Sequence, residues 1–411
     1  MLNWIAAGIL TICGALSYGE LAAAMPKAGG QYVFLKEAYN KLFGFLYGWT
    51  LFTVIQTGTI AAVGVAFAKF TGVFFPAISG DNVLFSILSF HFSTQQCLAI
   101  AVIVLLTLFN FRSIKNGAFV QNLFTFIKVA ALLFMIVAGL VAGINGKGNM
   151  HHFTPLFTGS FSLDTILIFG AAMVGSAFSA DAWNNVTFTA AEVRNPQKNL
   201  PIALVLGTGM VISIYILVNF IYLYIMPIDA IAHAQNDRVG TLLMENVFGS
   251  AGLYFMAAVI MVSTFGCLNG LILSGSRVYY AMAKDRLFFR QAGQLNKNNV
   301  PAKSLIFQCI WASLLTLTGS YSNLLDYVIF AVLIFYILTI SGIFILRKKQ
   351  PGLPRPYKVF GYPYIPILYL IIATTICITL IIKRPEYTYP GLGIVLLGIP
   401  IFYLLERRKK N

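Results

Sequence analysis

The sequence predicts an all-α protein that crosses a membrane many times, and three observations lead to this fold class. Only 10% of the 411 residues are charged and 58% are hydrophobic, whereas soluble chains carry roughly 25% charged residues. Apolar runs of about 18 residues or more recur from end to end, and each is long enough to cross about 30 Å of hydrocarbon. Lys and Arg gather in alternate loops between these runs, as in membrane proteins of fixed orientation.

The apolar runs predict about eleven spanning helices. In chain order they cover residues 4–24, 41–70, 94–111, 117–144, 164–192, 200–226, 250–284, 304–319, 323–346, 362–382 and 389–405. No linker between them is long or polar enough to hold a soluble domain. We therefore expect residues 1–411 to form a single transmembrane domain.

The basic residues predict how the helices are oriented. If the C-terminal run 406–410 lies in the cytoplasm, 22 of the 28 Lys and Arg fall on that side and five on the other, while Lys128 lies inside a helix. The positive-inside rule therefore predicts a multi-pass protein of the plasma membrane with a cytoplasmic C-terminus. The same rule accounts for the net charge of +15, so the lipid bilayer is an expected partner and nucleic acid is not.

The reactive side chains do not indicate a metal site, a cofactor or an enzyme. His151 and His152 lie in a polar loop without a neighbouring carboxylate, and no nucleophile–base arrangement is apparent. The cysteines lie in or beside apolar runs, with no CxxC pair and no histidine at ligand spacing: Cys13, Cys97, Cys267, Cys309 and Cys377. We expect no cofactor, no bound metal and no enzymatic activity.

Segment 164–192 carries a carboxylate, Asp181, on what is otherwise an apolar helix. An unpaired charge at a helix centre costs about 2.5–3.5 kcal/mol on insertion scales, so such residues usually face a cavity or a partner. Broken helices are tolerated at membrane depth where they line a cavity, and transporters use such breaks to hold charged groups of substrates. The alternative is a loose helix–helix contact in which Asp181 bonds to a neighbouring hydroxyl. Small polar residues surround the carboxylate: Ser176, Ser179, Asn184 and Asn185.

Lys128 is a second charge inside an apolar run. It lies roughly 16 Å along a helix that starts near Gly117, at about 1.5 Å per residue, which is near mid-depth. One reading is a side chain that reaches back to the interface. The other is an internal ammonium that replaces a bound cation or exchanges a proton. Proton exchange is possible because burial readily lowers the pKa of a lysine.

Further polar groups lie within two other predicted helices, 41–70 and 250–284. Each of these groups alone is typical of a helix–helix contact. Together with residues 176–185 they predict one central polar cavity. They are Gln56, Thr57, Thr59, Ser263 and Thr264.

Three long stretches resemble amino-acid permeases of the amino acid–polyamine–organocation (APC) superfamily, and specifically its L-type branch. Residues 14–35, GALSYGELAAAMPKAGGQYVFL, resemble the end of that family's second helix and the loop after it. Residues 263–288, STFGCLNGLILSGSRVYYAMAKDRLF, resemble its eighth helix and cytoplasmic exit. Residues 176–201 resemble its sixth helix, by the marks Asp181-x-Trp183-Asn184 and Glu192-x-x-Asn195-Pro196-x-x-Asn199-x-Pro201. The resemblance covers the chain from Trp4 onward.

The resemblance implies the LeuT-like fold of two inverted five-helix repeats, which works by alternating access. Segment 4–24 matches the second of the family's twelve helices, 164–192 its discontinuous substrate-site helix, and 362–405 two extra C-terminal helices. The family's substrate site carries over to Phe178, Ser179, Ala180, Asp181 and Asn184, with Phe178 as the aromatic lid. Lys128 matches a lysine that ties the first helix to the eighth in place of sodium, and its eighth-helix partner would lie around Ser263.

Two departures from the family pattern affect these expectations. The family's first helix, with its Gly-Ser-Gly loop for the substrate carboxylate, has no match, because Met1 falls where the second helix begins. We expect either a start further upstream or a fragment with half its site. Residues 71–93 contain no cysteine where heavy-chain-linked relatives carry one, so no disulfide-linked heavy chain is expected.

The expected function is secondary active transport of neutral amino acids, by exchange or by proton symport. The expected partners are therefore an amino acid and, for symport, the proton. The alternative is a truncated, non-transporting remnant or fragment of such a permease.

Overall fold

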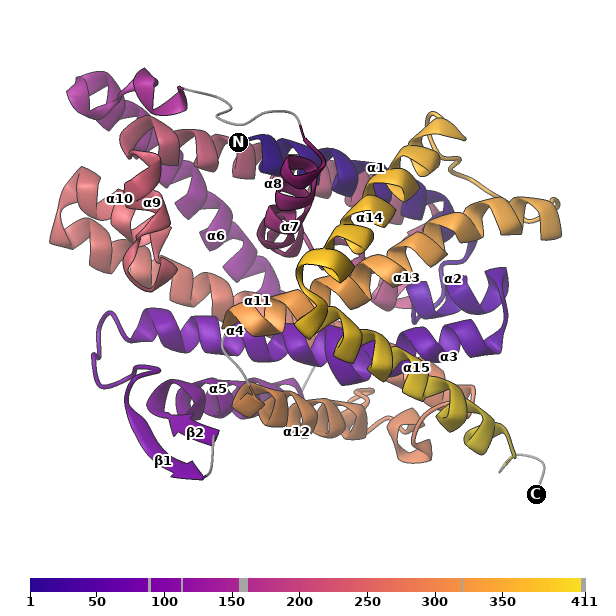
Figure 1. The fold of residues 1–411 in the computed structure, drawn as a ribbon. Helices are drawn as coiled ribbons and strands as arrows, with labels where there is room; N and C mark the ends of the chain where they lie inside the picture. The colour runs from indigo at the N-terminus through magenta and orange to yellow at the C-terminus, as the bar shows by residue number, and fades with distance from the viewer. Residues whose placement is uncertain (88–89, 112–113, 155–161, 319–320, 408–411) are drawn as a thin grey trace.

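The computed structural model describes residues 1–87, 90–111, 114–154, 162–318 and 321–407 (Figure 1). Its long helices cross the view of Figure 1 side by side. One end of the molecule carries β1, β2, α9 and α10, and we call it the hairpin end. The opposite end carries α2 and the C-terminus, and we call it the basic end. Arg112 and residues 408–410, which the orientation prediction uses, lie outside the described residues.

The helices and strands follow one another in this order: α1 (Leu2–Ala24), α2 (Gln31–Ala38), α3 (Lys41–Thr50), the π-helical turn η1 (Leu51–Ile55), α4 (Gln56–Thr71), β1 (Val83–Ile87), β2 (Phe90–Ser93), α5 (Thr94–Asn110), α6 (Ile114–Ala142), η2 (Gly143–Lys147), η3 (Met150–Phe153), α7 (Leu163–Ser179), η4 (Trp183–Glu192), α8 (Pro196–Ile225), α9 (Ile228–Ala232), η5 (Gln235–Asp237), α10 (Val239–Phe248), α11 (Ser250–Lys284), η6 (Arg290–Gly293), α12 (Ala302–Thr318), α13 (Tyr321–Lys349), α14 (Tyr364–Lys383) and α15 (Pro385–Arg407).

Each predicted spanning segment coincides with helical structure. Within the described ranges, eight helical segments are long and apolar enough to cross a membrane, and three apolar helices of 10–17 residues are shorter. Two of the shorter ones, α5 and α12, lie where spans were predicted. The molecule is thus a helical, polytopic membrane protein.

The helices pack around a core in which α1 lies along α8, and α4 lies along α11. Fully buried aromatic side chains such as Tyr18, Phe34 and Phe45 fill this core. By contrast, Val137, Leu206 and other large apolar side chains on the long helices are more than half exposed. Contiguous exposed apolar surface of this kind is stable in hydrocarbon and not in water.

The helical fold includes one short β-hairpin that the sequence analysis did not predict. Strands β1 and β2 form an antiparallel hairpin at the hairpin end, with Phe85 opposite Phe92 and their rings stacked at 4.9 Å. The β1 sequence, VLFSI, is rich in the β-branched and aromatic residues that favour strands. The segment is too short to cross a membrane, and hydropathy alone did not separate it from a loop.

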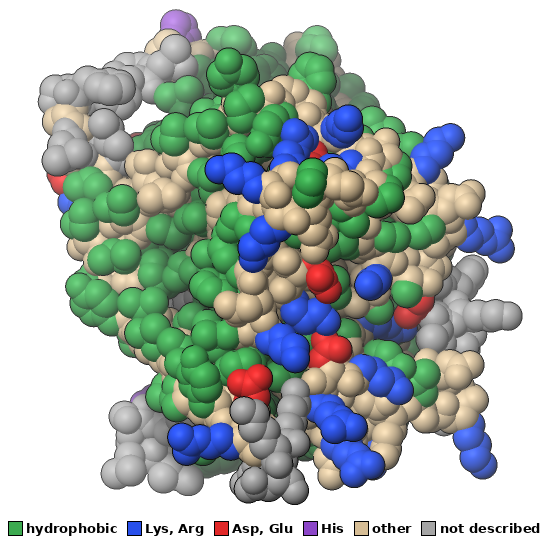
Figure 2. Space-filling view, turned by 90° about the vertical axis from the view of Figure 1, so that its right-hand side faces the viewer, with side chains coloured by type: hydrophobic (Ala, Val, Ile, Leu, Met, Phe, Trp, Pro, Cys, Tyr) green, Lys and Arg blue, Asp and Glu red, His purple; other side chains and the backbone are tan. Residues whose placement is uncertain are grey.

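At the basic end, helix α2 is bound to the loop after α11. The Lys36 ammonium lies 2.7 Å from the Asp285 carboxylate, and the Tyr32 hydroxyl donates a hydrogen bond to the same oxygen at 2.6 Å. Burial, together with the hydrogen bond to this carboxylate, raises the pKa of Tyr32, so the hydroxyl stays a donor. Figure 2 views the molecule from this end and shows Lys and Arg side chains spread over it.

Candidate functional site

The helix that carries Asp181 is interrupted beside this residue. Helix α7 ends at Ser179, Ala180 caps it, and the chain continues after Ala182 as the 3₁₀-helix η4. Ala182 has φ 63° and ψ 7°, in the left-handed region. Ser and Asp disfavour the helix interior because their side chains compete for backbone hydrogen bonds. The break therefore arises from local sequence, and it frees backbone groups beside a carboxylate.

Ala182→Gly is expected to stabilise the protein by about 1 kcal/mol, because the left-handed conformation costs an L-residue with a Cβ about 1–2 kcal/mol. The measurement is the thermal unfolding temperature of the detergent-purified protein, which should rise. Ala180→Gly is the matched control, since Ala180 has φ −93° and ψ 0°. That change should leave the unfolding temperature equal or lower. An unfolding temperature that falls in Ala182→Gly would contradict the assigned backbone strain.

Asp181 belongs to a chain of polar side chains drawn from three elements. Tyr336 of α13 donates its hydroxyl to Asp181 Oδ1 at 2.7 Å and lies 3.2 Å from Asn184 Oδ1. Asn184 Nδ2 donates to Gln31 Oε1 at 2.9 Å, and Gln31 Nε2 donates to Thr339 Oγ1 at 3.0 Å. Gln31, Asn184 and Thr339 are at most 3% exposed. Because buried polar groups are costly when unpaired, this network fixes the position of the carboxylate.

A small cavity lies against this network. Its volume is about 20 Å³, roughly enough for one water molecule. Asp181, Asn184 and Tyr336 line it from one side, and Gln56 of α4 lines it from the other. Gln56 also donates to the Leu271 carbonyl at 2.7 Å, so α4, α11 and α13 close around the break. The space beside Asp181 on this side is therefore nearly filled.

A larger cavity, of about 480 Å³, opens on the other side of the break. It lies between α6, η4 and α11, and it shares Ala182, Asn185 and Leu271 with the small cavity. An ion pair between Glu192 and the buried Arg277, with Nε 3.1 Å from Oε1, lies in its wall. Small-molecule sites commonly have about 300–1,000 Å³, so this cavity has room for an amino acid.

The predicted site residues divide into two groups. Asp181 and Asn184 lie together in the network at the small cavity. Phe178, Ser179 and Ala180 line neither of the two cavities. Phe178 packs against a small cluster on α4, and the Ser179 hydroxyl donates to the Gly175 carbonyl at 2.8 Å. The structure thus brings the Asp181 carboxylate and the Asn184 amide together, and the Phe178 ring lies outside both cavities.

Lys128 of α6 lines the larger cavity, close to Cys267 of α11. Within the described part of the chain, the Lys128 ammonium makes no hydrogen bond or ion pair. Ser263, the predicted partner, lies one helical turn before Cys267 and does not line this cavity. The two coupling residues are therefore on facing helices without a direct bond between them.

Three residues of the network were not predicted: Gln31, Tyr336 and Thr339. Gln31 lies in a short helix outside the predicted spans, and the other two lie inside an apolar run. Their only sequence signal is a polar group on an apolar segment, and such groups are more often simple helix–helix contacts. Gln56, by contrast, was predicted to reach a central cavity and lines one.

The chain matches the amino acid permease family over residues 1–399. It is 31% identical to the serine/threonine exchanger SteT of Bacillus subtilis, over 99% of this chain and 89% of that protein. It is 28% identical to human b(0,+)-type amino acid transporter 1, over 98% of this chain and 80% of that protein. It is 30% identical to human large neutral amino acids transporter small subunit 2, over 98% and 73%. The chain therefore belongs to the amino acid permease family, which comprises multi-pass membrane transporters and not enzymes.

Proposed function

We propose that this permease exchanges neutral amino acids across the plasma membrane by alternating access. The observation that carries the proposal is the interrupted α7, whose break places Asp181 in the wall of a nearly filled cavity, next to a larger cavity that shares three wall residues with it. Such an arrangement suits a site that is reached from one side at a time. Relatives described as a serine/threonine exchanger and a large neutral amino acids transporter support exchange and neutral substrates. Proton symport is the competing mode.

The proposed fold is the LeuT-like arrangement of two inverted five-helix repeats, with α14 and α15 as the two additional helices. Its support is the break in α7, the pairing of α1 with α8, and the pairing of α4 with α11. In this fold discontinuous helices meet near the bilayer midplane, where their free backbone groups bind substrate. Residues 1–411 act as one domain.

In the proposed site the substrate ammonium lies between the Asp181 carboxylate and the backbone carbonyls of Phe178 to Ala180. Asn184 holds the carboxylate through Tyr336, which bonds to both side chains. The Phe178 ring packs against α4 in the present conformation. It closes over the substrate when α7 moves relative to α4. Ser179 contributes its carbonyl, which accepts a hydrogen bond from the Tyr215 hydroxyl at 3.1 Å in the present conformation.

Lys128→Ala is expected to lower the uptake rate about tenfold. The reason is that the ammonium supplies a positive charge in the wall of the substrate cavity and couples it to α11, through the region of Ser263. The measurement is the initial rate of uptake into proteoliposomes. Lys147→Ala is the control, because Lys147, at the end of η2, donates to the Asn246 carbonyl of α10 at the hairpin end. A wild-type rate in Lys128→Ala would end the coupling assignment.

The proposed orientation places the basic end in the cytoplasm, with the C-terminus on that side. Its support is the Lys and Arg cover of this face in Figure 2 and the positive-inside rule. The hairpin end then faces outward. A disulfide-linked heavy chain is not part of the proposal, since residues 71–93 contain no cysteine and Cys97 lies in the first turn of α5.

The test is uptake of a labelled amino-acid mixture into proteoliposomes that hold the 411-residue chain. It is run with and without amino acids inside, and with and without an inward proton gradient. We expect uptake that depends on internal neutral amino acids. Uptake that depends on the proton gradient alone would replace exchange by symport. No uptake by a protein with a cooperative unfolding transition would overturn the proposed transport and favour the non-transporting remnant.

A further inference from the structure

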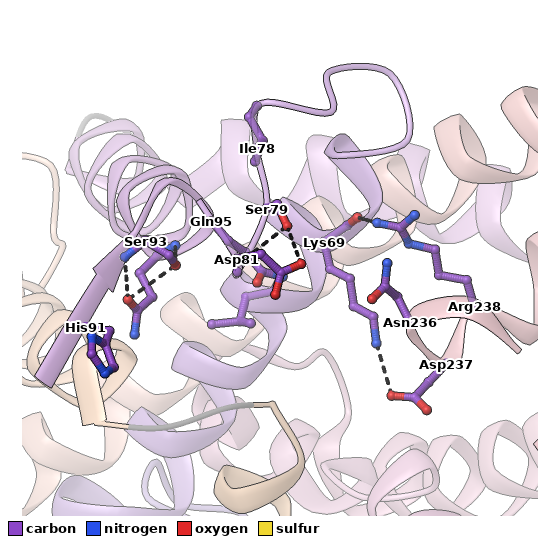
Figure 3. A pocket seen from close by; sticks show the side chains of 13 residues that line it. Lys69, Ile78, Ser79, Asp81, His91, Ser93, Gln95, Asn236, Asp237 and Arg238 are labelled. Carbon is purple, nitrogen blue, oxygen red and sulfur yellow. Dashed lines mark hydrogen bonds and ion pairs between the residues drawn. The ribbon is translucent and has the colours of Figure 1, made fainter. Parts of the chain in front are cut away.

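A separate cavity of about 410 Å³ lies at the hairpin end (Figure 3). Its wall comes from the end of α4, from the loop that leads to the hairpin, and from η5 before α10. It shares no residue with the two cavities at the break in α7. The charged residues in its wall are Lys69, Asp81, Asp237 and Arg238, and the His91 ring lines it as well.

The cations of this cavity are held by backbone as well as by carboxylates. Arg238 Nη2 donates to the Lys69 carbonyl at 2.6 Å, which joins η5 to α4. The Lys69 ammonium lies 3.4 Å from the Asp237 carboxylate; the Lys69 side chain is 17% exposed and the Asp237 side chain 92%. Solvent around Asp237 screens this long pair, so it contributes little, about 0–1 kcal/mol. The side of the cavity near Arg238 thus keeps its positive potential.

Arg238 and Asp81 both have bonding capacity that the protein does not use. Among the described residues, Arg238 Nε is buried and has no hydrogen-bond partner. A buried donor of this kind costs about 1–3 kcal/mol when it is left unpaired. Within the described residues, the exposed Asp81 carboxylate accepts one side-chain hydrogen bond, from the Ser79 hydroxyl at 3.2 Å. Figure 3 shows Asp81 on one side of Lys69 and Arg238 on the other.

We propose that this cavity is an external binding site for the zwitterionic head group of an α-amino acid. The substrate carboxylate bonds to the Arg238 guanidinium, and its ammonium faces Asp81. The pairing of both charge signs excludes a simple anion, which Asp81 would repel, and the described residues hold no cluster of three metal-ligating side chains. An adjoining cavity of about 480 Å³ also contains Asp81 and Arg238, so a bound side chain has space on either side of the pair.

The choice of ligand rests on the proposed function, and so does the assignment of the hairpin end to the outer face. The site itself is independent of the central one, because no wall residue is common to both. An external site captures substrate before it enters the transport path. It therefore lowers the external KM and leaves the internal KM and kcat unchanged.

The test compares Asp81→Asn and Arg238→Gln in right-side-out vesicles, with L-serine and L-threonine as substrates. Each change should raise the external KM about tenfold, as expected for the loss of one charge-assisted bond, with kcat and internal KM at wild-type values. Asp81→Asn keeps the contact between Arg238 and Lys69, so it separates ligand binding from the structural role of that contact. Lys383→Gln is the control, since Lys383 pairs with Asp164 outside the cavity.

Equilibrium dialysis of the purified protein with labelled L-serine gives a second readout that does not need transport. Wild-type protein should show two classes of site, and Asp81→Asn should lose one of them. If the chain did not transport, the loss of one class of site in Asp81→Asn would still identify the external site. The proposal is overturned if both variants keep the external KM and both classes of site, or if the KM changes equally on the two faces. It is also overturned if only Arg238→Gln has an effect.

Discussion

Asparagine in place of Asp181 is expected to lower kcat/KM for amino-acid uptake about a hundredfold, with the protein still folded. The amide keeps the shape of the carboxylate and an oxygen that accepts the Tyr336 hydroxyl, now at 2.7 Å. It loses the negative charge, which in the proposed site is the counter-ion of the substrate ammonium. A bond to a charged group contributes about 1.5–3 kcal/mol, and about 2.8 kcal/mol corresponds to a factor of one hundred.

The matched control for this change is Asp164→Asn. Asp164 is also an aspartate of α7, but its carboxylate is largely exposed and pairs with the Lys383 ammonium at 2.6 Å. Exposed pairs contribute about 0–1 kcal/mol, so uptake should change less than about twofold. Both variants are measured by initial rates over a range of substrate concentrations, next to their unfolding temperatures. Wild-type kinetics in Asp181→Asn would remove this residue from the site.

Much of the fold follows from hydropathy, because each long helix buries or exposes an apolar run that no soluble protein would carry. What hydropathy missed lies between those runs. The hairpin of β1 and β2, and the short helices α9 and α10, have too few residues to produce a clear period.

The site was predictable only in part, for a different reason. Asp181 and Asn184 stand out because a carboxylate and an amide are costly inside an apolar helix. Gln31 and Tyr336 join them from positions roughly 150 residues away on either side, as the hydrogen bonds show. No local pattern encodes such a contact. Only the packing of α2 and α13 against η4 creates it, and that packing is a property of the whole core.

A carboxylate at the basic end, Glu20 of α1, holds together three segments of the chain. Arg347 donates two hydrogen bonds to it, at 2.9 and 2.7 Å, and the Val359 backbone N–H donates a third at 2.8 Å. Arg355 Nε lies 3.4 Å away. Glu20 is 2% exposed, and the Arg347 guanidinium lies 3.6 Å from the centre of the Tyr362 ring. Glu20 therefore neutralises two arginines where α1 meets the end of α13.

Glu20→Gln is expected to destabilise the protein by about 3 kcal/mol. The amide fits the same space but leaves two guanidinium groups without a counter-ion, and breaking a buried pair from one side costs about 3–5 kcal/mol. The measurement is thermal unfolding in detergent, with Glu386→Gln as control, because Glu386 is exposed at the start of α15. In a double-mutant cycle, Glu20→Gln with Arg347→Gln should destabilise less than the sum of the single changes, since both remove the same ion pair. Strictly additive losses would mean that the two side chains act separately and that Glu20 is held mainly by Arg355 and the Val359 backbone.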